Sequence, residues 1–215
     1  MQIEFFHDVL CAFCYALGPR VHRLVDEHPE VEIIHRSFAL APTPYDLVRM
    51  FGSPDEAKRQ ILGHWRTANA LDDGHRMRPE LMATRPFPYP HSMPGLLACK
   101  AAEKQAGQAG HWAMIDQVQD AHLVQCQDIA DREVLAGCAE QADLDVDQWR
   151  VDVDSPEVRA AVDSDIALAR AYGISGVPML VAEGRYGFSG AQPYEQLEAW
   201  LDAVSQRLAE EEQKA

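Results

Sequence analysis

Two cysteines three positions apart constrain the fold of this chain more than any other feature. Cys11 and Cys14 enclose an alanine and a phenylalanine. Residues 2–7, which precede the pair, predict a short strand because apolar and polar side chains mix there without a glycine or proline. After the pair, apolar residues continue at helical spacing, at Leu17, Val21 and Leu24. The pair therefore stands between a strand and a helix, with Cys11 at the start of the helix.

This position suits thiol–disulfide exchange. At the N-terminus of a helix the free N–H groups and the helix dipole favour a thiolate, which is the reactive form of cysteine. A second thiol one turn further on is placed to attack the first sulfur and to release a bound partner. The spacing thus predicts Cys11 as the nucleophile and Cys14 as the resolving thiol.

Half of a zinc site and two unrelated structural cysteines are the alternatives for a C-x-x-C pair. Zinc requires two further ligands, usually at short spacing. Cys99, Cys126 and Cys138 form no second close pair, and His7 and His22 are interpreted as strand-end or surface residues. We therefore expect no metal site and no bound cofactor.

A second feature is Gly176-Val177-Pro178-Met179, where a later strand is predicted to begin. Proline has no N–H to donate to a sheet and is confined to strand starts and edges. Taken alone, Pro178 is an ordinary trans proline. If the Val177–Pro178 bond is cis, Val177 presents its backbone to an extended partner beside the thiolate, and the two residues form a substrate-binding site.

The first two-thirds of the chain predict a β-α-β unit followed by a helical block. Residues 31–38 form the second predicted strand. Residues 43–150 are predicted to be almost entirely helical, and Ser53-Pro54 is a typical helix start. Gly107 and Gly110 separate two helical stretches in the middle of this block.

The alternation of helix and strand returns towards the C-terminus. A helix after Ser155, strands at 177–181 and 186–189, and a last helix at about 193–208 are predicted. This order indicates an α/β protein.

The predicted elements divide the chain into two parts. We assign residues 1–42 and 151–215 to one α/β domain and residues 43–150 to a helical insertion within it.

Charge and hydropathy narrow the classes of function. Acidic residues outnumber basic ones by 34 to 19, for a formal charge of −15, which disfavours nucleic acid and anionic membrane surfaces as partners. No apolar stretch is long enough to span a bilayer, and the N-terminus lacks the basic leader of a secretory signal. These observations predict a cytoplasmic protein, whose five cysteines are expected to be thiols rather than a disulfide framework.

Three segments together resemble the DsbA family of the thioredoxin superfamily, specifically its FrnE-like branch. They are DVLCAFCY at 8–15, GISGVP at 173–178 and GRYGFSGAQP at 184–193, and the resemblance extends over essentially the whole chain. It implies a thioredoxin fold with a large helical insertion, catalytic Cys11 and Cys14, and a cis-Pro178 that faces them. It also implies partners that are protein or small-molecule thiols and disulfides.

The chain departs from the family pattern between the cysteines. Members of the branch usually carry Pro and Trp there, where this chain has Ala12 and Phe13, and periplasmic DsbA proteins carry a histidine that helps the thiolate. Without a cation in the motif we predict a less oxidising pair, nearer to thioredoxin at about −270 mV than to DsbA at about −120 mV. His91-Ser92 stands where the branch usually has Asn-Ser or Asn-Thr.

Several other residues carry expectations of their own. Asp8 is a candidate for tuning the thiol pKa, with a capping role in the loop as the alternative.

The other three cysteines differ in their expected burial. Cys99 and Cys138 lie among apolar residues at helical positions and are expected to pack as small apolar groups. Cys126 lies between two glutamines and is expected to be exposed. The four tryptophans fall in helices and are expected to anchor the core or an interface: Trp65, Trp112, Trp149 and Trp200.

Two other functions fit parts of the pattern. Glutathione-dependent enzymes of the kappa-class transferase and chromene-carboxylate isomerase type are similar in fold, but they usually have serine in place of Cys11 and lack the second cysteine. A non-catalytic peptide-binding holdase would use the groove near Pro178 without a reactive pair.

For the direction of exchange we favour reductase or isomerase activity. The redox potential of the cytosol, about −220 to −320 mV, keeps a thioredoxin-like pair largely reduced. The sequence leaves the oligomeric state open.

Overall fold

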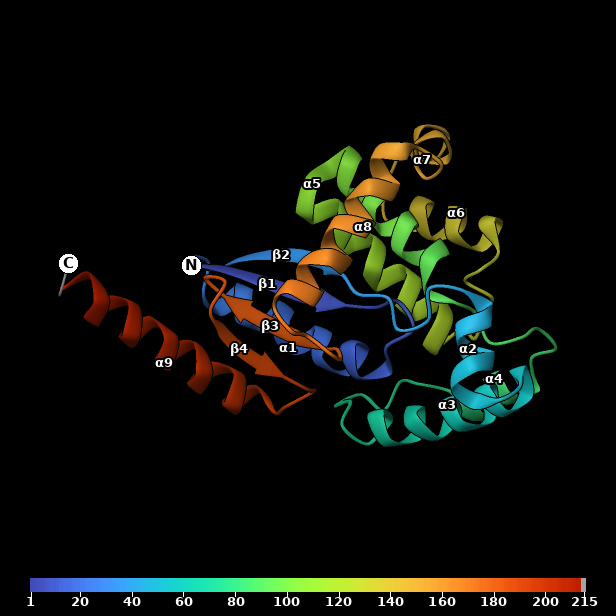
Figure 1. Ribbon diagram of the computed structural model, residues 1–215, viewed down its shortest axis with the longest axis horizontal. Coiled ribbons are helices and arrows are strands. Elements are labelled where there is room, and N and C mark those ends of the chain that lie inside the picture. The colour runs from blue at the N-terminus through green and yellow to red at the C-terminus, as the bar shows by residue number, and fades with distance from the viewer. Residues whose placement is uncertain (214–215) are drawn as a thin grey trace.

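A four-stranded mixed sheet lies at the centre of the protein (Figure 1). The computed structural model describes residues 1–213. The strand order is β2-β1-β3-β4. Strand β1 is parallel to β2, whereas β3 is antiparallel to both β1 and β4. The strands are β1 (Gln2–His7), β2 (Glu32–Ser37), β3 (Met179–Ala182) and β4 (Tyr186–Ser189).

Six of the described helices, α2 to α7, lie between β2 and α8 in the sequence, as the helical block predicts. The Ser53 and Ser155 side chains accept hydrogen bonds from backbone N–H groups of Glu56 and Val158, so both predicted helix starts are confirmed. The division into a domain and an insertion at 43 and 150 stays a prediction. The helices are α1 (Ala12–Glu27), α2 (Pro44–Phe51), α3 (Pro54–Asn69), α4 (Pro79–Thr84), α5 (Ser92–Leu123), α6 (Arg132–Gln141), α7 (Val146–Asp152), α8 (Pro156–Ala171) and α9 (Tyr194–Glu212).

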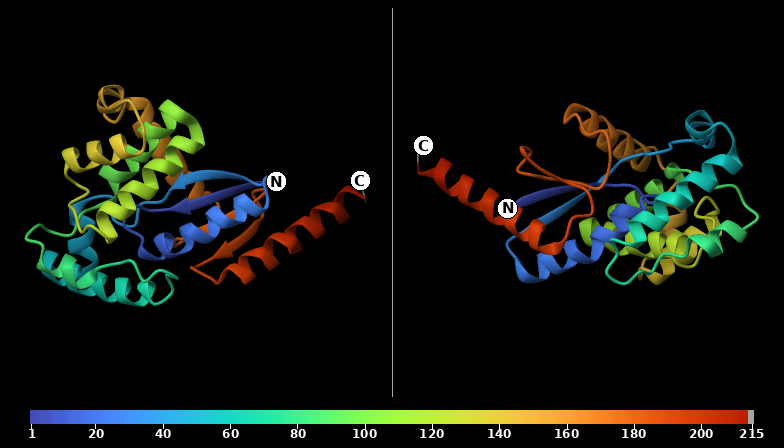
Figure 2. Two further views of the ribbon diagram at one scale, coloured as in Figure 1. Left: turned by 180° about the vertical axis from the view of Figure 1, so that it is seen from behind. Right: turned by 90° about the horizontal axis from the view of Figure 1, so that it is seen from below.

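The two faces of the sheet are covered by different helices (Figure 2). Successive side chains of a strand point to opposite faces, so Phe5 and Phe6 belong to separate clusters. Phe6 packs with Val181 and with Ala169 of α8. Phe5 packs in the main core, which includes Leu17 of α1. The sheet is therefore a central layer, as an α/β fold requires.

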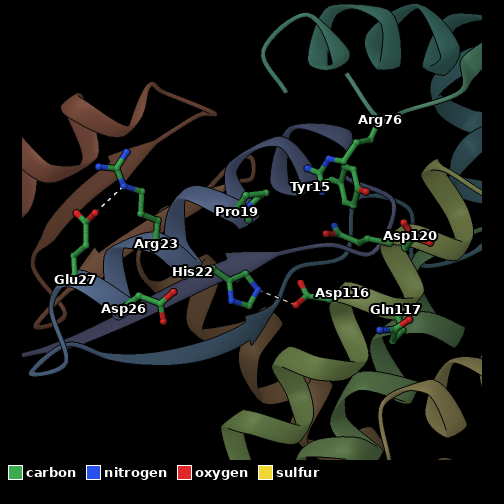
Figure 3. A pocket seen from close by; sticks show the side chains of 12 residues that line it. Tyr15, Pro19, His22, Arg23, Asp26, Glu27, Arg76, Asp116, Gln117 and Asp120 are labelled. Carbon is green, nitrogen blue, oxygen red and sulfur yellow. Dashed lines mark hydrogen bonds and ion pairs between the residues drawn. The ribbon is translucent and has the colours of Figure 1, made fainter. Parts of the chain in front are cut away.

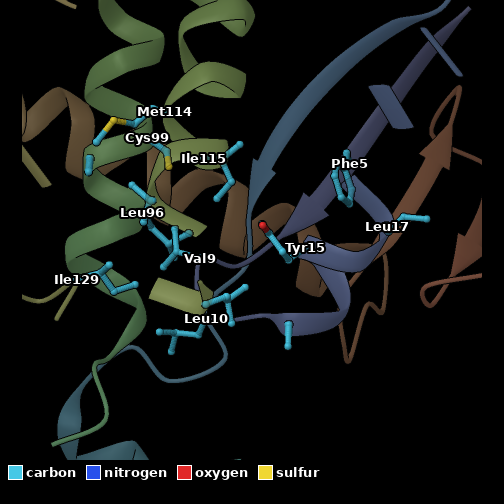
Figure 4. Close-up of a cluster of buried hydrophobic side chains, with 14 of the residues drawn as sticks. Phe5, Val9, Leu10, Tyr15, Leu17, Leu96, Cys99, Met114, Ile115 and Ile129 are labelled. Carbon is cyan, nitrogen blue, oxygen red and sulfur yellow. The ribbon is translucent and has the colours of Figure 1, made fainter. Parts of the chain in front are cut away.

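The loop that carries the cysteines is packed tightly against α5. Figure 4 shows Val9 and Leu10 beside Leu96, in the main core. Val9 is fully buried, and a Cβ at Gly95 would lie only 2.7 Å from its Cγ2 atom. A glycine at this position lets α5 approach the loop closely enough to hold it in place.

Helix α5 is interrupted where the sequence predicts a break. Ala106 and Gly107 leave helical geometry, and Gly107 has φ 63° and ψ −152°. This region of backbone conformation is open essentially to glycine alone. A Cβ at Gly110 would lie 2.5 Å from the carbonyl oxygen of Ala102, so the chain after the break packs closely against the helix before it.

Replacing Gly107 by alanine is expected to lower the free energy of unfolding by about 1–3 kcal/mol, because alanine disfavours this backbone conformation. Gly137 is the matched control, since it lies inside α6 and a Cβ there meets no atom within 4 Å. Gly137→Ala is expected to raise stability by about 0.5–1 kcal/mol. Urea unfolding of both variants measures the difference, and equal stabilities would contradict the prediction.

The remaining cysteines and the tryptophans are mostly where the sequence predicts them. Cys99 and Cys138 are buried, and so are Trp65 and Trp149. The other two tryptophans, Trp112 and Trp200, are partly buried against the core.

The prediction that Cys126 is exposed is wrong, because only 1% of this residue is accessible. Its backbone adopts φ 56° after the end of α5, which turns the chain inward, and its Sγ atom lies 3.3 Å from the carbonyl oxygen of Arg78. The neighbouring glutamines therefore gave a false indication of exposure at this helix end.

Among residues 1–213, no helix combines the length and the apolar character that crossing a membrane requires.

Candidate active site

Cys11 lies directly before the first turn of α1 and acts as its N-cap. Its Sγ atom accepts a hydrogen bond from the backbone N–H of Cys14, at 3.1 Å. The Cys11 N–H in turn donates to the carbonyl oxygen of Asp8, at 3.0 Å. The sulfur thus occupies the place where a helix has unpaired N–H groups to offer to a negative charge.

The segment around Pro178 lies beside this sulfur although it is distant in the sequence. The Val177–Pro178 bond is cis. The Cys11 thiol donates to the carbonyl oxygen of Val177, at 3.5 Å, across 166 positions of sequence. Pro178 leads into β3, which pairs with β1, so the sheet brings this segment to the end of the strand that precedes the cysteines.

The two thiols have different surroundings. Both residues are almost inaccessible, at 4% for Cys11 and 2% for Cys14. Burial raises the pKa of the Cys14 thiol well above its usual range, and the hydrogen bond with Cys11 and the charge of Cys11 add to the increase. Cys14 is therefore held as a neutral thiol in the reduced protein.

An apolar pocket of about 270 Å³ opens onto Cys11. Within the described part of the chain, Cys11 lines this pocket and Cys14 does not. A molecule in the pocket would therefore meet the first sulfur of the pair. The other lining residues are mostly apolar or aromatic: Leu10, Ala12, Phe13, Leu40, Met50, Phe51, Ile61, His64, Trp65, Tyr89 and Val177.

A larger cavity, of about 660 Å³, is lined by residues of α1 and α5 and by Arg76 (Figure 3). Its walls are mainly charged or amide-bearing, and His22 pairs there with Asp116 at 2.8 Å. None of the cysteines in residues 1–213 lines it. The smaller apolar pocket is therefore the one that can serve chemistry at Cys11.

Asp8 is fully buried three residues before Cys11. Its Oδ2 atom accepts hydrogen bonds from the Leu40 N–H, at 2.6 Å, and from the Ser92 hydroxyl, at 2.7 Å, while its Oδ1 atom accepts from the Leu10 N–H, at 3.0 Å. Burial raises the pKa of this carboxyl to about 6, although the hydrogen bonds oppose the increase. Asp8 thereby ties the cysteine loop to the start of α5 and to residue 40.

Two residues that support the loop are not indicated by any spacing in the sequence. The Gln119 side chain donates to the carbonyl oxygens of Asp8, at 3.0 Å, and Cys11, at 3.5 Å. Ser92 also accepts from the Ala41 N–H, at 3.0 Å. The only signal for Ser92 is its position in the pair His91-Ser92, where the branch that the sequence resembles usually has Asn-Ser or Asn-Thr.

Comparison with known proteins gives a match of residues 5–187 to the family model described as thioredoxin. The structure is similar to that of the cytosolic disulfide reductase DsbM from Pseudomonas aeruginosa, with a TM-score of 0.74, 20% identity, and coverage of 97% of this chain and 99% of that one. It is also similar to a probable DsbA oxidoreductase, SCO1869, from Streptomyces coelicolor, with a TM-score of 0.73, 26% identity, and coverage of 98% and 91%.

Among curated proteins, the ClpXP adapter protein SpxH of Shouchella clausii is 27% identical over 195 residues, which cover 84% of this chain and 57% of the adapter. The chain thus spans a little over half the length of the adapter proteins it matches. The assignment to an FrnE-like branch stays a prediction.

Proposed function

The chain belongs to the thioredoxin family, and from this premise we propose that it is a thiol–disulfide oxidoreductase with Cys11 as nucleophile and Cys14 as resolving thiol. The observation that carries the proposal is the position of the Cys11 sulfur, which caps α1, borders an apolar pocket and lies 3.5 Å from the Val177 carbonyl. The similarity to structures described as a disulfide reductase and a probable DsbA oxidoreductase supports the same reaction class.

The reaction consists of two sulfur exchanges. The Cys11 thiolate attacks one sulfur of a partner disulfide, which forms a Cys11–partner bond and releases the other partner sulfur as a thiolate. The Cys14 thiol then gives up its proton to the partner thiolate released in the first step, and its sulfur attacks the Cys11 sulfur. The partner leaves as its second thiolate, the Cys11–Cys14 disulfide closes, and two electrons have passed from the pair to the partner.

The partner would approach along Val177 and Pro178, which are the proposed substrate-binding residues. An extended segment would pair with the backbone of Val177, as peptides do when they add a strand to a sheet edge, once the Cys11 thiol has lost the proton that it donates to the Val177 carbonyl oxygen. The pocket beside Cys11 would take an apolar side chain next to the partner disulfide, since its walls are mostly hydrocarbon. Substrates with an apolar residue beside the disulfide are therefore favoured.

Asp8 would tune this pair from inside the loop. A charge on its carboxyl contributes to the raised pKa of Cys14. Its bonds to Leu10, Leu40 and Ser92 also fix the turn from which Cys11 emerges. The role is that of a positioning residue, because the carboxyl oxygens are already occupied by these donors.

Equilibration with glutathione buffers of graded potential tests the redox proposal. Trapping the thiols and mapping them by mass spectrometry is expected to give a reversible Cys11–Cys14 disulfide with a midpoint nearer about −270 mV than about −120 mV. Phe13 supplies no cation to hold the thiolate, which is the reason for the low potential. A midpoint near the DsbA value would contradict the prediction, and failure of the two cysteines to pair would overturn the proposed function.

A peptide-binding role without catalysis is the second candidate. It is favoured by the exposed apolar side chains of α2, where Tyr45 is 72% and Met50 50% accessible, and by the match to adapter proteins. A Cys11→Ser, Cys14→Ser protein that suppresses client aggregation as well as the wild type would support this role, provided that the wild type exchanges no disulfides.

A glutathione-dependent transferase or isomerase, the first alternative in the sequence analysis, is the third candidate here, because the presence of both Cys11 and Cys14 argues against it. Disulfide exchange in the absence of glutathione conjugation and isomerisation would identify the oxidoreductase and exclude the glutathione-dependent enzyme.

A cytoplasmic location stays a prediction, as does the preference for reduction or isomerisation over net oxidation.

A further inference from the structure

Three buried histidines converge beside the cysteine loop although they come from β1, β2 and α5. They are His7, His35 and His111, and each is at most 1% accessible. Their ring centroids lie 5.0 to 5.2 Å apart. Each ring offers a nitrogen such that the three nitrogen atoms lie within 4.8 Å of one another. Three imidazoles are the protein ligand set of many zinc sites.

The nitrogen positions suit a shared cation. His7 Nε2 and His35 Nδ1 lie 3.0 Å apart. Two nitrogen ligands of one tetrahedral zinc ion are separated by about 3.3 Å, given Zn–N bonds of about 2.0–2.1 Å. In the present arrangement one proton between these two nitrogens links the rings. A cation can take its place when the donor ring carries its proton on its other nitrogen instead, so that both facing nitrogens offer a lone pair.

His111 presents the third nitrogen. Its Nδ1 atom lies 2.7 Å from a carboxylate oxygen of Glu103, so Nδ1 carries the proton and Nε2 has a free lone pair. Nε2 is buried and has no hydrogen-bond partner among the described residues. An unpaired buried polar atom is costly, which a ligand on Nε2 would remedy. Carboxylate groups orient zinc-binding histidines in the same way as Glu103 orients this ring.

The charged groups around the cluster form one network, in which the positive charge of Lys100 opposes a cation at the three rings and is itself paired with two carboxylates. Lys100 lies 2.6 Å from Glu103 and 2.8 Å from Asp165, and Arg36 pairs with Asp165 and Glu4. This network contains three carboxylates and two cations, so it has one negative charge in excess.

We propose that His7, His35 and His111 bind one divalent cation of the zinc class, with a fourth coordination position left for water. Imidazole ligands suit zinc better than calcium or magnesium, which prefer oxygen. The cation would join the ends of β1 and β2 to α5, one residue before Asp8. The proposed metal site does not depend on the proposed disulfide exchange. The spacing of the three histidines in the sequence does not indicate this site.

Metal titration of an untagged Cys11→Ser, Cys14→Ser protein tests the site, because this variant cannot bind zinc through the cysteine pair. Calorimetry with Zn²⁺ is expected to give one equivalent of binding, and Co²⁺ is expected to give the absorption bands of a four-coordinate site with nitrogen and oxygen ligands. X-ray absorption at the zinc edge is expected to show imidazole scattering. Uptake without a stoichiometric endpoint, or a coordination shell of oxygen alone, would overturn the proposal.

Variants in the same background locate the metal. His111→Phe preserves a ring of similar shape and is expected to abolish the binding, while Glu103→Gln is expected to weaken it by about 10- to 100-fold. His22→Gln is the matched control, since His22 is a half-exposed histidine outside the cluster, and it should leave the affinity unchanged. Equal affinity of the His111→Phe and control proteins would rule the site out. If His111→Phe does not fold, the absorption spectrum of the parent protein decides alone.

Discussion

Serine at position 11 is expected to abolish disulfide reduction, with a fall in rate of about 10³-fold or more, as when an enzyme loses its covalent nucleophile. Cys11 is the cysteine that borders the pocket and accepts the Cys14 N–H at the start of α1. A hydroxyl in its place is not ionised at neutral pH and does not attack a disulfide. Reduction of insulin with glutathione as the electron source measures the loss.

Serine at position 14 is expected to leave the first attack intact and to block the second. The partner should then accumulate as a mixed disulfide on Cys11, which intact-mass spectrometry detects. Cys138→Ala is the matched control, because Cys138 is a buried core thiol that does not line the pocket at Cys11. Retained activity in the Cys11→Ser protein, or a partner bound to Cys138, would contradict the assigned roles.

Alanine at position 65 is expected to lower the free energy of unfolding by about 3–5 kcal/mol, the usual cost of removing a buried tryptophan. Trp65 is 1% accessible, and its indole N–H donates to the Tyr89 hydroxyl, at 3.0 Å. Both rings line the pocket beside Cys11. The substitution should therefore also raise KM for a substrate with an apolar residue beside its disulfide, by about tenfold, which corresponds to about 1.4 kcal/mol.

Trp149→Ala separates the effect on the pocket from the effect on stability. Trp149 is fully buried and donates to the Ala98 carbonyl oxygen, at 3.1 Å, but it does not line the pocket at Cys11. Its replacement should destabilise the protein by a similar amount and leave KM unchanged at temperatures where both variants are folded. Chemical unfolding and steady-state kinetics give the two quantities, and an equal rise of KM in both variants would refute a substrate role for the pocket.

Local patterns were enough to predict most of the elements and the cysteine pair. The spacing of Cys11 and Cys14 and the apolar repeat after them depend only on neighbours within one or two helical turns. The same holds for the break at Gly107, because its backbone conformation excludes other residues whatever surrounds them. Helix starts at Ser53 and Ser155 are likewise decided by groups three residues away.

Predictions of exposure were less secure, because exposure depends on how distant segments pack. Cys126 illustrates this, since its polar neighbours indicate a surface position while a left-handed turn directs it into the core. The partners of Asp8 illustrate it too, because Leu40 and Ser92 lie 32 and 84 positions away. No periodicity in the sequence connects residues at such separations.

The sequence by itself determined the strand, the thiol pair and the helix that follows it, since each depends on interactions between residues close in the chain. The resemblance to a known family also led us to expect Pro178 opposite the cysteines. Only the tertiary structure decided which pocket residues surround the reactive sulfur and which residues lie behind the cysteine loop. The pairing of β1 with β3 brings Val177 to within 3.5 Å of Cys11 across 166 positions. The pairing of β1 with β2 and the packing of α5 on β2 gather His7, His35 and His111. The physical reason is that sheet order and helix packing minimise the free energy of the whole core, so they place together residues that no local spacing relates.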